Sequence, residues 1–142
     1  MITAIGVGPM IVDHLWEPIA RQHMRNPAWS PHAKFHDAQY ITMSALISAI
    51  ALRILFQREG DPHVRLRNAA ALSSVSWLGM WGAMLFPGTA ATDPEFVSEP
   101  TERPIAGLPP QLFLSIIGLG GLAATVKADA VRARHEPAPA PG

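Results

Sequence analysis

Residues that could carry out acid–base chemistry gather in the N-terminal part of the sequence. Asp13 and Glu17 are four residues apart, so a helix would place both carboxylates on one face. His32 and His36 have the same spacing further along the chain. Carboxylates beside imidazoles supply a proton donor and a proton acceptor, whose pKa values a low-dielectric site can separate. We therefore predict catalytic roles for these four residues and for Asp93.

A metal site is an alternative for the same histidines. The spacing of His32 and His36 is that of helical zinc and non-haem iron sites, but Ala33 stands where an HExxH motif has its glutamate. Two histidines four residues apart are common by chance, so our preferred interpretation has no metal and no cofactor. A third ligand would have to come from another carboxylate: Asp13, Glu17, Asp93 or Glu95.

Aromatic and amide side chains near these residues are candidates for substrate contacts. A stripe of side chains at spacings of three and four accompanies the two histidines. Two tryptophans further along are four residues apart and share a helix face, although such residues also form the aromatic belt of membrane proteins. The predicted substrate-binding residues are Trp29, Phe35, Gln39, Trp77 and Trp81.

The composition indicates a small membrane protein. Charged residues make up 15% of the 142-residue chain, whereas about 25% is ordinary for a soluble domain. The net charge of zero gives no basic field for nucleic acid, and the absence of cysteine excludes disulfides and thiolate metal sites. Phosphate-binding glycine loops and nucleophile elbows are also missing from the sequence.

The apolar runs predict an all-α, integral membrane four-helix bundle over residues 1–127. The first run has only about a dozen apolar residues before Asp13, whereas a membrane span needs roughly 20. Either this helix carries charged residues into the membrane, or the start codon lies upstream. The Pro/Ala-rich tail, residues 128–142, is predicted to be disordered. The four helices are expected at about residues 2–20, 31–57, 68–86 and 110–126.

Local signals indicate where helices begin and where they pack. Ser30 followed by Pro31 predicts an N-cap and a first helical residue. Ser44 and Ser48 are small residues at a spacing that allows close packing of helices in lipid. Gly118 belongs to a glycine cluster that indicates either another close-packing face or a weak kink.

The loop charges predict an orientation. Four spans place both termini on one side, together with the second connection. That connection and the tail carry seven basic residues, four and three respectively, whereas the other two connections carry four. The positive-inside rule then places both termini in the cytoplasm. The first and third connections share the opposite side, so His32 and His36 are predicted to face Asp13, Glu17 and Asp93 at the mouth of the bundle.

The polar stretch between the first two predicted helices resembles the NPxWPPHxxFHxxQ signature of a family of small, uncharacterised membrane proteins. That family occurs in actinobacteria and fungi, sometimes near biosynthetic genes. Residues 86–96 resemble a second family element, and the likeness covers roughly residues 5–125. Ser30 and Asp37 depart from the pattern. The resemblance implies a four-helix membrane fold and no established activity. The matching residues are Asn26, Pro27, Trp29, Pro31, His32, Phe35, His36 and Gln39.

Two classes of function fit these observations. The first is a membrane-embedded acid–base enzyme, an isomerase or cyclase acting on a lipophilic terpenoid or polyketide type intermediate. The second is a non-enzymatic binding or accessory protein, in which the histidines only cap helices and fix turns. In either case we expect the protein to lie in a bacterial cell membrane, in contact with membrane lipid. A homo-oligomer is possible under both hypotheses, and no nucleic acid partner is expected.

Overall fold

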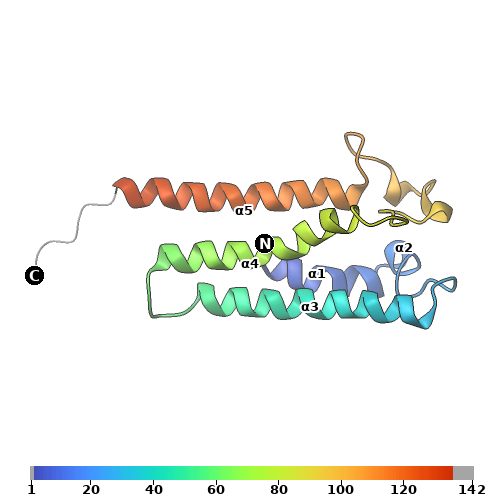
Figure 1. Cartoon of the computed structure of the whole chain (residues 1–142), viewed down its shortest axis with the longest axis horizontal. Helices are drawn as coiled ribbons and strands as arrows, with labels where there is room; N and C mark the ends of the chain where they lie inside the picture. The colour runs from blue at the N-terminus through green and yellow to red at the C-terminus, as the bar shows by residue number, and fades with distance from the viewer. Residues whose placement is uncertain (1, 136–142) are drawn as a thin grey trace, which may run out of the picture.

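The computed structural model describes residues 2–135, and the chain is helical through most of that range (Figure 1). This confirms the prediction of an all-α fold. The helices are α1 (Ile2–Leu15), α2 (Glu17–Ala20), α3 (Pro31–Leu55), α4 (Pro62–Ala83) and α5 (Pro110–His135), with the short 3₁₀ helices η1 (Pro94–Phe96) and η2 (Pro100–Glu102) in the last connection.

The first predicted helix, residues 2–20, is divided in two. The backbone of Trp16 is extended, with φ −88° and ψ 102°, and separates α1 from α2. Pro18 explains the break, because proline has no amide hydrogen and its ring would collide with the carbonyl of His14 in a continuous helix. The chain therefore turns at the end of α1 instead of running straight on.

Side-chain caps set the starts of α3 and α4. The Ser30 hydroxyl accepts a hydrogen bond of 3.1 Å from the amide of Ala33, which confirms the predicted N-cap. Asp61 does the same for α4, accepting a hydrogen bond of 2.7 Å from the amide of His63. Because Pro62 follows this cap as the first helical residue, α4 begins earlier than the predicted start near residue 68.

The last helix is longer than predicted. Part of the expected disordered tail, from residue 128 up to His135, is helical in the structure, and residues 136–142 lie outside the described range. Alanine and arginine make up five of the eight residues of this segment, and they are strong helix formers. Asp129 also forms an ion pair of 2.9 Å with His63, which ties the end of α5 to the start of α4.

The long helices pack in a row rather than in a closed ring. α3 packs against both α1 and α4, and α5 packs against α4. Figure 1 shows α5 on the opposite side of α4 from α3, with the α3–α4 turn and the C-terminal end of α5 together at one end of the molecule. α2 and the long α4–α5 connection lie at the other end. The four-helix arrangement is therefore open between α1 and α5.

Small and polar residues fill the helix contacts, whereas large apolar residues face outwards. Ser44 and Ser76 are buried and share a hydrogen bond of 3.1 Å between α3 and α4, which confirms the predicted packing role of Ser44. Gly118 of α5 lies directly against the ring of Trp77. The large side chains exposed on α3 and α5 include Met43, Leu46, Ile50, Leu114, Ile116 and Ile117.

Two described helices, α3 and α5, are long and apolar enough to cross a membrane, by length and composition alone. The prediction of four such helices is not met. α1 has only 14 described residues, and the serines and the asparagine of α4 dilute its apolar character. Two of those serines, Ser73 and Ser76, are buried.

Candidate functional site

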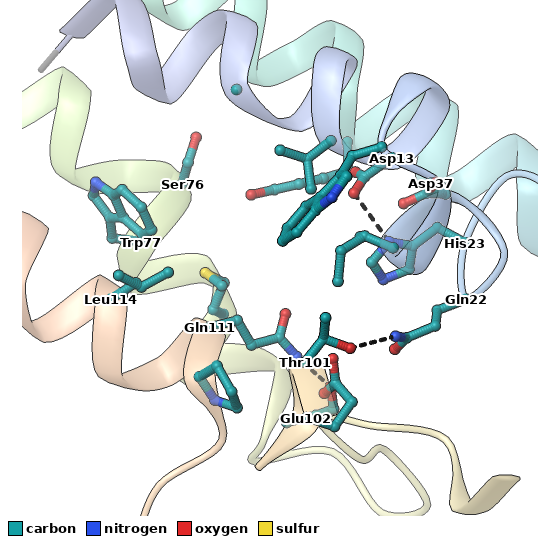
Figure 2. A pocket seen from close by; sticks show the side chains of 18 residues that line it. Asp13, Gln22, His23, Asp37, Ser76, Trp77, Thr101, Glu102, Gln111 and Leu114 are labelled. Atoms are coloured by element: carbon teal, nitrogen blue, oxygen red, sulfur yellow. Dashed lines mark hydrogen bonds and ion pairs between the residues drawn. The ribbon is translucent and has the colours of Figure 1, made fainter. Parts of the chain in front are cut away.

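A cavity of about 530 Å³ opens at the end of the molecule that carries α2 and the long connection. It occupies the open side of the row, with walls from α1 and α5 as well as from the helices between them (Figure 2). Its lining includes Asp13 of α1, Asp37 of α3, Trp77 of α4, Leu114 of α5 and Glu102 of the long connection.

A paired carboxylate and imidazole form one wall of this cavity. Asp13 is 7% exposed, and its Oδ1 lies 2.9 Å from Nδ1 of His23 (Figure 2). The break at Trp16 makes this pair possible, because α2 turns the chain back and brings the segment after it over the end of α1. The other ring nitrogen of His23, Nε2, has no hydrogen-bond partner in the described part of the chain. It is therefore available to a bound molecule.

The surrounding carboxylates make His23 a stronger base. Burial of the ring lowers the pKa of His23, and the hydrogen bond and charge of Asp13 raise it. The charges of Asp37 and Glu102 add to this rise, so that the pKa of His23 lies above its ordinary value of 6.5. Asp13 also favours the tautomer with the proton on Nδ1, since a carboxylate accepts hydrogen bonds.

Asp37 adds a second carboxylate to the same wall of the cavity. Figure 2 shows its carboxylate next to Asp13 and His23. The Oδ2 atom of Asp37 is shielded from solvent and has no hydrogen-bond partner. An unpartnered buried polar atom is costly, so this oxygen is an unsatisfied acceptor beside the cavity.

The long connection after α4 closes the cavity from outside. Arg21, just after α2, forms an ion pair of 2.8 Å with Glu99 of the connection. Gln22 donates a hydrogen bond of 3.4 Å to the hydroxyl of Thr101. At the other end, the side chain of Gln111 donates to the carbonyl of Ala91. These contacts hold the connection as part of the cavity wall.

Two of the predicted site residues form a chain of contacts that begins at His23 and lies outside the cavity lining. Trp29 packs against the His23 ring, with 5.7 Å between ring centroids. Its indole nitrogen donates a hydrogen bond of 3.1 Å to Asp93. Neither residue lines the cavity. The structure therefore places Trp29 as a packing partner of the imidazole and Asp93 as the hydrogen-bond acceptor of Trp29.

The predicted histidine pair lies apart from the cavity. Nε2 of His36 is 3.1 Å from Nε2 of His32, and its Nδ1 is 3.2 Å from the side-chain oxygen of Gln39. Both histidines are exposed, as is Phe35, which stacks on His32. The predicted meeting of this pair with Asp13, Glu17 and Asp93 does not occur, because the histidines lie one position away from the inward stripe of α3. One position is about 100° of helix rotation.

Of the remaining predicted residues, one lines the cavity and two do not. Glu17 is exposed and pairs with Arg25 at 2.6 Å. Trp81 donates a hydrogen bond of 2.8 Å to Ser115 and does not line the cavity. Trp77 does line the cavity, so its ring is placed to contact a bound molecule. Within residues 2–135 no group of three histidine or acidic side chains is placed to hold a metal ion, so the third ligand of the metal alternative is missing.

His23 and Asp37 are the site residues that the sequence reasoning missed. A signal for Asp37 was present, since the buried residues Ser48, Ser44 and Ile41 lead back to it in steps of four and three. His23 carried no such signal, because it follows the break in the first helix and its position depends on that turn.

Comparison with known proteins leads to one family. No curated protein and no solved structure matches the chain. A family model described as a family of unknown function, DUF6640, matches residues 1–132. The match includes all the residues that line the cavity. It confirms the expectation of an uncharacterised family, and the chain belongs to the DUF6640 family of unknown function.

Proposed function

We propose that this chain is a membrane-embedded enzyme that moves protons on a lipophilic small molecule, in an isomerase or cyclase type of reaction on a terpenoid or polyketide type intermediate. The observation that carries the proposal is the Asp13–His23 pair in the wall of a cavity of about 530 Å³. The volume is in the range of small-molecule sites. The pair supplies the reacting group, and the apolar walls select the class of substrate.

The distribution of side chains supports a membrane location. In α3 and α5, only 22% of the most apolar 18-residue stretch is buried within the chain, whereas the core helix of a soluble protein is mostly buried. Small residues such as Ser44, Ser73 and Ser115 fill the interior instead. This arrangement is typical of helices that pack in lipid, where small residues allow close contact. With 25 residues, α3 is about 37 Å long and long enough to cross the apolar layer.

The ends of the molecule differ in charge, which supports an orientation. The α3–α4 turn and the C-terminal end of α5 lie together (Figure 1). By the positive-inside rule, we place this end in the cytoplasm and the cavity at the opposite surface. The basic residues at the cytoplasmic end are Arg53, Arg58, Arg65, Arg67, Lys127, Arg132 and Arg134.

The geometry supports a proton-transfer mechanism through His23. Asp13 holds the proton on Nδ1, so the lone pair of Nε2 can remove a proton from a carbon of the substrate. The electron pair of the broken C–H bond moves into the substrate, and the charge of Asp13 stabilises the imidazolium. A proton then returns from Nε2 to a different carbon. The net result is an isomer, with His23 and Asp13 restored to their starting states.

Hydrogen exchange with solvent provides a test that does not require the substrate to be known. The full chain, reconstituted in lipid nanodiscs, would be incubated in D₂O with a lipid-soluble extract of the cells that produce it. Because a proton held on His23 exchanges with water, we expect a lipophilic compound to gain deuterium at carbon. Mass spectrometry would detect the gain, which should be lost in Asp13→Asn and His23→Gln.

Two further variants sharpen this test. His135→Gln is a matched control, since His135 lies at the far end of α5, and it should leave the exchange unchanged. Loss of exchange in His36→Gln but not in His23→Gln would overturn the assignment. A protein that binds a lipophilic compound without any exchange would instead be the non-enzymatic binding protein of the alternative hypothesis.

A further inference from the structure

The cavity has an excess of negative charge. Its described lining contains three carboxylates, on Asp13, Asp37 and Glu102, and one imidazole, on His23. The same lining includes neither lysine nor arginine. Even with His23 protonated, the carboxylates outnumber the positive charges. An anionic ligand would therefore be repelled, and a cationic one attracted.

Two arginines at this end of the molecule are paired with carboxylates outside the cavity. Arg21 is paired with Glu99 at 2.8 Å, and Arg25 is paired with Glu17 at 2.6 Å. None of these four residues lines the cavity. The charges of Arg21 and Arg25 are therefore matched outside the site.

Asp37 is the carboxylate that lacks a partner. Asp13 has His23, and the Oε2 atom of Glu102 accepts a hydrogen bond of 2.7 Å from Thr92. Within residues 2–135, the Oδ2 atom of Asp37 is buried and has no hydrogen-bond partner. The charge of this carboxylate would attract a positively charged group in the cavity.

The opposite side of the cavity suits an apolar body. Figure 2 shows Trp77 and Leu114 across the cavity from Asp13, Asp37 and His23. Tyr40 also contributes an aromatic ring to the lining. Aromatic faces attract cations as well as apolar groups, so these rings are compatible with a positive charge and with the apolar part of the same molecule.

We infer that the cavity recognises lipophilic cations, molecules with an apolar body and one positively charged group that pairs with Asp37. This inference rests on the proposed function for the site itself and adds the charge class of its ligand. A permanent ammonium group meets the requirement.

Binding of three matched probes tests this inference. Each probe has the same brominated alkyl chain, and the head groups are trimethylammonium, hydroxyl and carboxylate. Bromine near Trp77 quenches tryptophan fluorescence, which reports binding to the full chain in nanodiscs of zwitterionic lipid. We expect the ammonium probe to bind roughly 10- to 100-fold more tightly than the hydroxyl probe, as an ion pair with a carboxylate would give, and the carboxylate probe to bind most weakly.

Variants separate this inference from the proposed function. Asp37→Asn should remove most of the preference for the ammonium probe. Glu59→Gln makes the same chemical change in the turn at the other end of the molecule, and it should leave the preference intact. Equal binding of the three probes, or a preference that survives Asp37→Asn, would overturn the inference. If the preference holds but no deuterium exchange is found, the proposed enzyme fails while the cation site stands.

Discussion

Replacing Gly118 by alanine tests how α5 and the cavity wall depend on each other. A Cβ atom at this position would lie 2.8 Å from Cε2 and 2.9 Å from Nε1 of Trp77. Carbon atoms in good contact are about 3.5–4.0 Å apart, so the rigid indole ring must move by roughly 1 Å to accept the methyl group. Because Trp77 is part of the cavity wall, this movement should also alter the site.

Gly120 provides a matched control for the size of the effect. It lies on the same helix, and an added Cβ would meet nothing within 4 Å. Both alanines gain helix propensity of up to about 1 kcal/mol, whereas only Gly118→Ala forces the core to repack, at about 1–3 kcal/mol. The free energy of unfolding of Gly118→Ala should therefore be about 1–3 kcal/mol below that of Gly120→Ala.

Equilibrium unfolding in mixed micelles, followed by circular dichroism, measures this difference. The variant Trp77→Ala removes the ring that would collide, so the double variant Gly118→Ala/Trp77→Ala should lose less stability than the sum of the two single variants. The affinity for the ammonium probe should fall in Gly118→Ala and not in Gly120→Ala. Equal stability of the two alanine variants would refute the packing of α5 against Trp77 described above.

Three other outcomes are expected. The pKa of His23 is raised in the folded chain, so its contribution to stability is complete below pH 6.5 and is lost as the pH rises through the folded pKa. The free energy of unfolding, measured across this pH range, should show the loss. Asp13→Asn should make this pH dependence smaller. Ser115→Ala removes the acceptor of the Trp81 indole hydrogen bond and should cost about 1–3 kcal/mol in unfolding free energy, with most of it recovered when Trp81→Phe is added. Ser30→Ala removes the N-cap of α3 and should cost about 1 kcal/mol, and an unchanged stability would contradict the cap.

The sequence predicted elements where a local signal was enough. Ser30 with Pro31 located the start of α3, because a cap acts through neighbouring backbone atoms alone. Asp61 with Pro62 is the same signal at the start of α4, although this helix was predicted to begin only at about residue 68. Pro18 likewise marks the break in the first helix, which was predicted to continue to about residue 20.

The site was harder to predict because it depends on the rotation of α3 about its own axis and on contacts between segments that are far apart in the sequence. Asp13 lines the cavity, and its partner is His23 and not the His32–His36 pair. The contacts of α3 with α1 and α4 decide which face turns inwards. The stripe through Ser44 and Ser48 indicates this face, and it leads to Asp37 rather than to His32 and His36. The long connection forms part of the cavity wall, and the ion pair between Arg21 and Glu99 helps to hold it there. Hydrophobic periodicity does not predict such a contact.

The state of the His23 ring tests the central claim most directly, because the proposed chemistry requires a proton on Nδ1 and a free lone pair on Nε2. Nitrogen-15 NMR of the labelled chain in nanodiscs, recorded above the pKa of His23, distinguishes the two neutral tautomers. We expect the Nδ1–H tautomer in the wild-type chain and a loss of this preference in Asp13→Asn. A neutral ring with its proton on Nε2 in the wild-type chain would contradict the account.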